Sequence, residues 1–176
     1  MPNNVGYLTA DTSVASDEVY TPVYAVKPII KYISNNDAII WCPFDEEDSN
    51  FVILLKEAGY SVIATHIKDG KDFFTYEPEN YDLIISNPPF SVKDRILKRL
   101  DELNKPYAML LPLPALQGQK RFNYLKNCQA LIFDKRINYI KNKKTKEIQK
   151  GVAFASIYIC KNFLPKDLIF EELEVE

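Results

Sequence analysis

The feature that most constrains the fold is the alternation of short apolar runs with helix-like segments. The apolar runs are rich in β-branched and aromatic residues, which predicts buried strands at 38–42, 61–65, 81–86, 107–111 and 130–133. Helices are predicted at 23–34, 49–58, 91–103 and 116–127. Such alternation favours an α/β fold with helices on both faces of a mainly parallel sheet. Ligands bind at the carboxyl ends of strands in these sheets, so the site is expected at 42–46, 65–70 and 86–91.

Polar residues at the predicted helix ends support these assignments. Ser49 is expected to cap the helix that follows it, and Gly59 to end that helix. Ser91 stands three residues before Asp94, which is the spacing of a capping box.

Composition narrows the class of protein. A chain of 176 residues, 47% hydrophobic and 26% charged, suits one globular domain, and a net charge of −2 excludes a coat that is basic throughout. Three separated cysteines and one histidine predict neither a disulfide framework nor a metal site. The chain has no apolar run of membrane-spanning length and no secretory pattern in its first twenty residues, so we expect a cytoplasmic protein without membrane contact.

The sharpest motif is Asn87-Pro88-Pro89-Phe90, directly after a predicted buried strand. The two prolines fix the backbone and remove two N–H donors, so the Asn87 side-chain oxygen and the Pro88 carbonyl are available as an acceptor pair. Such a pair can hold both N–H groups of a planar amine and make its nitrogen more nucleophilic. Phe90 can stack on a nucleobase that has been turned out of a duplex. The alternative is an ordinary strand-to-helix turn.

The segment Ser86-Asn87-Pro88-Pro89-Phe90 resembles the catalytic motif of S-adenosylmethionine-dependent amino-methyltransferases, especially the adenine-N6 enzymes. The resemblance extends over residues 18–162. It includes the segment Glu18-Val19-Tyr20-Thr21-Pro22, similar to the family's "TP" segment, and Asp69–Phe74, similar to its "DG-x-DF" segment. Residues 41–45 stand in the place of the first cofactor loop, and 110–114 in that of a substrate-side loop.

This resemblance implies a class I methyltransferase-like fold: a doubly wound, mostly parallel, seven-stranded sheet with one antiparallel strand, here at 152–160. It implies S-adenosylmethionine as cofactor and transfer of its methyl group to N6 of adenine in nucleic acid. The implied catalytic residues are Asn87, Pro88, Pro89 and Phe90. The implied cofactor-binding residues are Tyr20, Thr21, Pro22, Pro43, Phe44, Asp45, His66, Asp72, Phe73 and Asn87.

Two segments depart from the family pattern. The first cofactor loop has no glycine and carries four acids at 45–48 instead, where Asp45 is the candidate for the cofactor's ammonium group. These acids also suit the start of a helix, because the helix dipole favours negative charge there. His66 stands where an acid normally binds the ribose, and it can also be a plain rim residue. Asp72 is expected to accept from the cofactor's amino group beside an apolar wall of Phe73 or Phe74, although either ring can instead pack in the core.

Basic residues are concentrated late in the chain. Residues 135–150 hold seven Lys or Arg and one Glu, which suits a hairpin that contacts a phosphate backbone and equally suits a solvated loop. The substrate-binding candidates are Gln117, Lys120, Arg121, Lys135, Arg136, Lys143 and Lys144. We expect a flexible segment at 1–18, a catalytic domain at 19–165 and an acidic tail at 166–176, without a separate target-recognition domain. The protein would then read a short or single-stranded context, act on RNA, or take recognition from a separate subunit or a second copy.

Three functions stay open at this point. The first is methylation of adenine N6, with DNA favoured over RNA. The second is methylation of a protein glutamine amide, which presents the same planar NH₂ group. The third is an inactive methyltransferase-fold protein, suggested by the glycine-free loop.

Overall fold

The computed structural model describes residues 19–142, 144–145, 147–148 and 154–175. The predicted flexible segment 1–18 lies outside these residues. The α-helices are α1 (Val23–Ile30), α2 (Asn50–Glu57), α3 (Lys93–Leu103) and α4 (Phe122–Leu125). The 3₁₀ turns are η3 (Ile67–Asp69), η4 (Phe90–Val92), η5 (Leu113–Leu116) and η6 (Gln119–Arg121). The strands are β1 (Ile39–Cys42), β2 (Ser61–Ala64), β3 (Leu83–Ser86), β4 (Tyr107–Pro112), β5 (Gln129–Phe133), β6 (Ile140–Asn142), β7 (Glu147–Ile148), β8 (Ser156–Lys161) and β9 (Leu168–Glu171).

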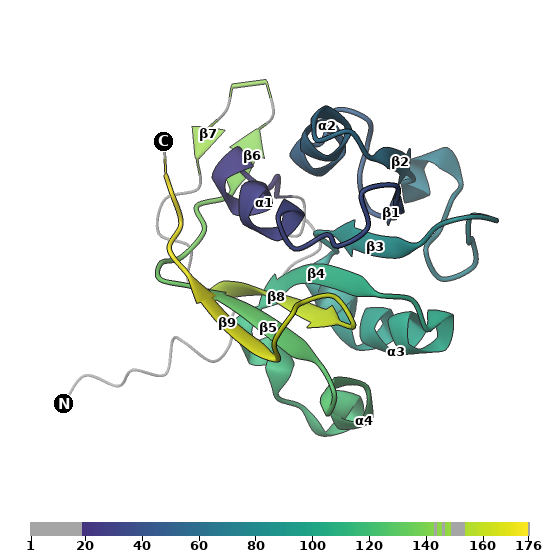
Figure 1. Ribbon diagram of the computed structural model, residues 1–176, viewed down its shortest axis with the longest axis vertical. Coiled ribbons are helices and arrows are strands. Elements are labelled where there is room, and N and C mark those ends of the chain that lie inside the picture. The colour runs from purple at the N-terminus through teal and green to yellow at the C-terminus, as the bar shows by residue number, and fades with distance from the viewer. Residues whose placement is uncertain (1–18, 143, 146, 149–153, 176) are drawn as a thin grey trace.

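In the described part of the chain, seven strands form one sheet in the order β2-β1-β3-β4-β8-β5-β9. The pairs among β2, β1, β3 and β4 are parallel, as is the pair of β5 with β9. Strand β8 runs antiparallel to both β4 and β5. Helices α1 and α2 cover one face of the sheet, and α3 and α4 cover the other (Figure 1). The predicted doubly wound, mostly parallel fold with one reversed strand is confirmed; the reversed strand begins at Ser156, and 152–153 of its predicted range lie outside the described residues.

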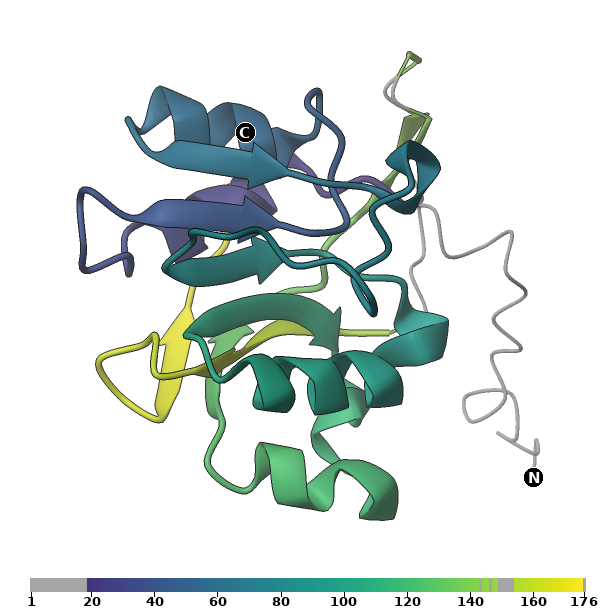
Figure 2. The same cartoon turned by 90° about the vertical axis from the view of Figure 1, so that its right-hand side faces the viewer.

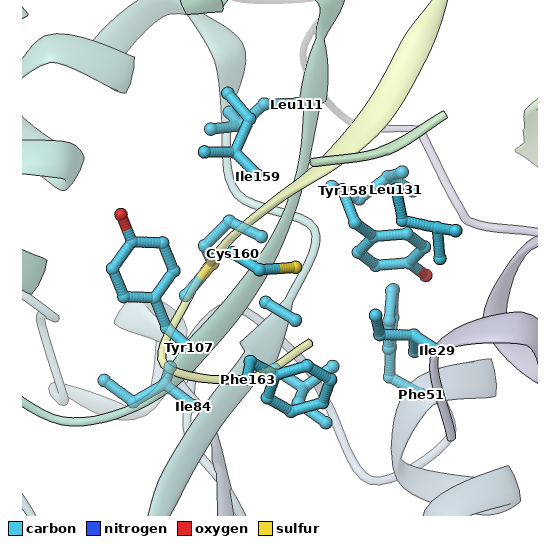
Figure 3. Close-up of a cluster of buried hydrophobic side chains, with 14 of the residues drawn as sticks. Ile29, Phe51, Ile84, Tyr107, Leu111, Leu131, Tyr158, Ile159, Cys160 and Phe163 are labelled. Atoms are coloured by element: carbon cyan, nitrogen blue, oxygen red, sulfur yellow. The ribbon is translucent and has the colours of Figure 1, made fainter. Parts of the chain in front are cut away.

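The core forms because the central strands are apolar on both sides, as buried parallel strands require. Strand β4 is buried from Tyr107 to Leu111. Side chains alternate between the two faces along a strand, so Tyr107 and Tyr158 lie on opposite sides of the sheet (Figure 3). The Tyr158 hydroxyl donates to the carbonyl oxygen of Ala25 at 2.8 Å, which ties β8 to α1 inside the core.

The ends of α2 follow the sequence prediction, and α3 ends at Leu103 as predicted, but the start of α3 differs from the prediction. The Ser49 side chain accepts from the amide of Val52 at 3.2 Å and caps α2, and Gly59 ends it with a φ of 94°. The predicted Ser91 cap is wrong, because the 3₁₀ turn η4 intervenes and makes Val92 the residue before α3, without a side-chain cap.

Two predictions for the second half of the chain need correction. The helix predicted at 116–127 is broken into short turns and the four-residue α4, with Gly118 extended between them. The segment predicted as an acidic tail contributes β9 to the edge of the sheet. Glu171 holds it there by pairing with Lys31 at 2.7 Å and accepting from the Tyr32 hydroxyl, so this acid is structural.

The parallel strands end on one side of the sheet. The arrowheads of β1, β2 and β3 point the same way in Figure 2, and the loops that follow them gather on that side. The predicted site segments therefore meet in space. Among the described residues, no helix is both long enough and apolar enough to cross a lipid bilayer.

Candidate active site

A pocket of about 900 Å³ lies at the carboxyl ends of the parallel strands. This volume is in the range of sites that hold a nucleotide-sized ligand. The sequence analysis had assigned many of its lining residues to the cofactor: Tyr20, Thr21, Pro43, Phe44, Asp45, His66, Asp72, Phe73 and Asn87. Pro22 is not part of the lining; it is the residue before α1. The structure thus brings together side chains from four separate segments of the chain.

The segment before α1 is held between two other elements. Backbone hydrogen bonds of 2.9 Å run in both directions between Tyr20 and Ile140, and the Asn50 side chain donates to the carbonyl oxygen of Thr21 at 2.7 Å. The Thr21 hydroxyl is buried and has no hydrogen-bond partner among the described residues. Since a buried hydroxyl without a partner is costly, this atom suits a polar group brought by a ligand.

The first loop replaces glycine with a buried carboxylate. Asp45 is 7% exposed and accepts a hydrogen bond from the hydroxyl of Ser86, the last residue of β3. A buried carboxylate needs such donors, and it favours a cationic group in the space beside it. The loop after β1 and the strand before Asn87 are therefore fixed to each other at the pocket wall.

The other acids of this loop divide into two kinds. Glu46 and Asp48 line the pocket, and Glu46 pairs with Lys68 at 3.2 Å. Glu47 is not in the lining and pairs with Lys56 of α2. The first turn of α2 contains no acid, so these residues precede the helix rather than complement its dipole directly.

Aromatic rings form part of the pocket lining, and the structure shows which of them mainly fill the core and which mainly line the pocket. Phe73 is only 2% exposed and packs on Trp41 at 5.4 Å and on Phe44 at 4.9 Å between ring centroids. Phe73 thus mainly fills the core, whereas Phe44 and Phe74 are half-buried and line the pocket. Trp41 is the single tryptophan of the chain, and it packs on Phe73 of the pocket lining, so its fluorescence is a probe close to this site.

Asp72 and His66 are positioned by short backbone contacts. An oxygen of the Asp72 carboxylate accepts from the amide of Phe74 at 3.0 Å. Nδ1 of His66 accepts from the amide of Lys68 at 3.2 Å, so Nε2 is the ring nitrogen that takes no part in this backbone contact. Both residues line the pocket.

The turn Asn87–Phe90 is divided between the pocket and the core. Asn87 and Pro89 line the pocket, and Oδ1 of Asn87 is buried without a hydrogen-bond partner among the described residues. Pro88 is buried and outside the lining. Phe90 is 8% exposed and packs edge-on against Phe154 at 5.5 Å between centroids, and against Tyr139 at 6.3 Å. The predicted stacking role of Phe90 is therefore not available in this conformation, because neighbouring rings cover its ring.

The basic segment forms a hairpin at the pocket rim. Strands β6 and β7 pair antiparallel, and Ile140 lines the pocket beside Tyr20. The Tyr24 hydroxyl accepts from the amide of Asn138 at 2.9 Å and anchors the approach to the hairpin. The side chains of the predicted contacts Lys135, Arg136 and Lys144 are exposed, and Lys143 lies outside the described residues.

Arg121, predicted to contact the substrate, is engaged in contacts within the protein. Its guanidinium donates to the carbonyl oxygen of Ala115 at 2.7 Å, pairs with Asp94, and donates to the carbonyl oxygens of two further loop residues. Arg121 thus fastens the 113–121 loop to the start of α3. Gln117 and Lys120 are exposed but are not part of the pocket lining.

Arg95 and Asn50 belong to the site and were missed by the sequence analysis. Arg95 lies in the first turn of α3, shortly after the Asn87 turn, and closeness in sequence to this motif was the available signal. Burial raises the pKa of the Cys42 thiol well above its usual value, with a further contribution from Asp45, so this cysteine beneath the pocket is a structural residue. The described residues hold no cluster of three or more His, Cys, Asp or Glu side chains able to bind a metal ion.

Comparison with known proteins supports the fold. No protein-family model matches the chain, and no curated protein sequence does. The chain is similar to the solved structure of a type I restriction-modification system methyltransferase subunit from Streptococcus thermophilus, with 12% sequence identity and a TM-score of 0.51. The match covers 87% of this chain and 46% of that one, so this chain spans less than half the length of its structural neighbour. The architecture is therefore that of a methyltransferase-like α/β fold.

Proposed function

We propose that this protein is an S-adenosylmethionine-dependent methyltransferase that acts on N6 of adenine in nucleic acid, with DNA as the favoured substrate. The observation that carries the proposal is Oδ1 of Asn87, a buried acceptor without a partner among the described residues, in a residue that lines a pocket of about 900 Å³. An acceptor left without a donor is costly in a folded protein, and a site that binds an amine supplies the donor.

The residues of the pocket fit the proposed cofactor. S-adenosylmethionine carries an ammonium group, for which the buried Asp45 carboxylate is suited, and an adenine ring, for which Asp72 and the ring of Phe44 are suited. One face of the Phe74 ring is covered by the guanidinium of Arg95. The unpartnered Thr21 hydroxyl offers a further polar contact. The cofactor, when bound, supplies an electrophilic methyl group on a sulfonium sulfur.

The chain itself orients the acceptor amine. Asn87 Oδ1 accepts one N–H of the adenine amino group, which helps to direct the nitrogen lone pair toward the methyl group. The second acceptor expected from the sequence, the main-chain carbonyl of Pro88, belongs to a residue outside the pocket lining. A bound cofactor would supply its methyl group to this nitrogen, with the sulfonium sulfur leaving with the bonding electrons, and the nitrogen would then give a proton to water. Orientation and preorganised dipoles account for the rate, so no metal ion and no strong base is assigned.

The basic hairpin supports nucleic acid as the acceptor. Lys141 and Lys144 are exposed on a hairpin whose base lines the pocket at Ile140. Positive charge beside the pocket mouth suits a phosphate backbone, and it does not specifically suit a glutamine side chain in a protein. We propose that sequence recognition comes from a separate subunit or a second copy, since base edges are usually read by a dedicated module.

The test is to incubate the protein with cofactor labelled in its methyl group and with DNA, RNA or total protein separately. We expect the label in DNA, recovered as N6-methyladenine after digestion. Label confined to protein would instead identify a glutamine methyltransferase. If no label is transferred, cofactor binding measured by Trp41 fluorescence decides between two explanations. A protein that binds cofactor lacks its true acceptor in the assay, whereas a protein that shows no binding at millimolar cofactor is an inactive methyltransferase fold.

A further inference from the structure

We infer that Arg95 binds a backbone phosphate of the nucleic acid beside the target nucleotide, an inference that rests on the proposed function. Arg95 stands in the first turn of α3, directly after the turn that contains Asn87, and both residues line the pocket. Its side chain is exposed, and the centre of its guanidinium lies 4.0 Å from the ring centroid of Phe74. The ring holds the guanidinium at the pocket while its edge N–H groups stay available.

Arg95 has no carboxylate partner among the described residues. Further along α3, Arg99 pairs with Glu77 at 3.6 Å and Lys98 with Glu102 at 3.8 Å. Lys93 also has no carboxylate partner there, but its ammonium group donates to the carbonyl oxygen of Phe90 at 3.4 Å and it does not line the pocket. Across the pocket, Lys68 is paired with Glu46. Arg95 forms no ion pair within the described ranges, and its described interaction is the one with the Phe74 ring. A planar guanidinium with free edge donors is the group that recognises a phosphate in bidentate fashion.

The placement of charge in the pocket distinguishes a phosphate from the cofactor's own carboxylate. Three acids of the loop after β1 line one wall: Asp45, Glu46 and Asp48. That wall suits the cationic amino-acid end of the cofactor, whereas Arg95 belongs to the wall formed by the Asn87 turn, where the acceptor is proposed to enter. The anion that Arg95 meets therefore comes with the acceptor.

The hairpin supplies the second cationic side of the mouth. Ile140 and Arg95 both line the pocket, one from β6 and the other from α3, and Lys141 follows Ile140 directly. A polyanion that delivers one nucleotide into the pocket can thus be held at two points, one from each element. A neutral substrate would use neither.

The test compares Arg95→Ala and Arg95→Lys with Lys98→Ala, a control cation on the same helix that lies outside the pocket lining and is paired with Glu102. Binding of a short, fluorescein-labelled single-stranded oligodeoxynucleotide containing adenine is followed by anisotropy from about 50 to 200 mM salt. For Arg95→Ala we expect affinity to fall about five- to tenfold at the lowest salt. We expect the slope of log K against log salt to decrease in magnitude by about 0.7, the contribution of one phosphate contact on a single strand. Arg95→Lys keeps the slope but loses part of the affinity, and Lys98→Ala changes neither.

Cofactor binding by the same variants is measured as well, because the proposed role of Arg95 predicts a change in oligonucleotide affinity and none in cofactor affinity. We expect the cofactor dissociation constant of Arg95→Ala, from Trp41 fluorescence, to stay within about twofold of the wild-type value, since the phosphate contact is absent in that assay. The proposed role of Arg95 is overturned if Arg95→Ala has the wild-type salt slope. It is also overturned if this variant binds the cofactor more weakly but binds the oligonucleotide with wild-type affinity. If the wild-type protein methylates DNA and Arg95→Ala keeps the wild-type salt slope, only this inference is refuted. If the wild-type protein binds no nucleic acid, the proposed function is refuted as well.

Discussion

Replacing Ser86 with alanine tests how the glycine-free loop is held in shape. The Ser86 hydroxyl is fully buried and donates to Asp45, whose carboxylate is 7% exposed. A hydrogen bond to a charged group contributes about 1.5–3 kcal/mol to stability. For a chain of this size, 1 kcal/mol shifts the melting temperature by about 2–4 °C, so Ser86→Ala should lower it by about 3–12 °C.

The same substitution should weaken cofactor binding, because Asp45 is the carboxylate proposed to hold the cofactor's ammonium group. We expect the dissociation constant to rise about tenfold, equivalent to about 1.4 kcal/mol. Trp41 fluorescence measures both quantities: its change with denaturant gives the free energy of unfolding, and its change with cofactor gives the affinity.

Ser156→Ala is the matched control. Ser156 is also buried in a strand, and its side-chain oxygen accepts from the Tyr139 hydroxyl at 2.7 Å. Its loss leaves that hydroxyl without this partner and costs about 1–3 kcal/mol, yet Ser156 does not line the pocket. If Ser86→Ala reduces cofactor affinity no more than Ser156→Ala does, the coupling of Ser86 through Asp45 to the cofactor is refuted.

Three further outcomes are expected. Tyr24→Phe removes the hydroxyl that anchors the hairpin approach and should weaken nucleic-acid binding about threefold, while Tyr32→Phe, the same change further along the first helical region, should leave anisotropy titrations unchanged. Lys144→Glu should lower oligonucleotide affinity and flatten its salt dependence, and an unaltered slope would remove the hairpin from the interface. The Leu173 amide lowers the pKa of Asp134, so the stabilisation exists above the unfolded-state pKa of about 3.9 and is lost as pH falls through the folded-state value. The melting-temperature difference between wild type and Asp134→Ala should therefore vanish in acid, and a difference independent of pH would contradict this.

The strands of the sheet were predictable wherever they are buried on both faces. Continuous apolar runs such as 81–86 and 107–111 have few other uses in a soluble chain. Strand β9 was not predicted, because Leu168-Ile169-Phe170 is short, half-exposed and followed by acids. The irregular turns at 113–121 were not predicted, because tertiary contacts hold this loop. These include the bonds of Arg121 and the hydrogen bond from the amide of Leu113 to the carbonyl oxygen of Ala155 at 2.8 Å.

The site was predictable by segment and less so by side chain. Strand ends at Asn87 and Asp45 meet because parallel strands share an edge, and this follows from topology. Burial of Phe90 depends on Phe154, which is distant in sequence and reaches the turn only through the reversed strand. The partners of the two arginines also differ: Arg95 stacks on the ring of Phe74, whereas Arg121 pairs with Asp94. No local sequence pattern reveals this difference, because both contacts join separate segments of the chain.

The central claim is that Asn87 orients the acceptor amine, and single-turnover methyl transfer by Asn87→Ala tests it most directly. With cofactor and adenine-containing DNA both saturating, the account predicts a rate about 10²–10³ times lower than wild type, with the cofactor dissociation constant from Trp41 fluorescence nearly unchanged. A variant that transfers methyl groups at nearly the wild-type rate would contradict the account.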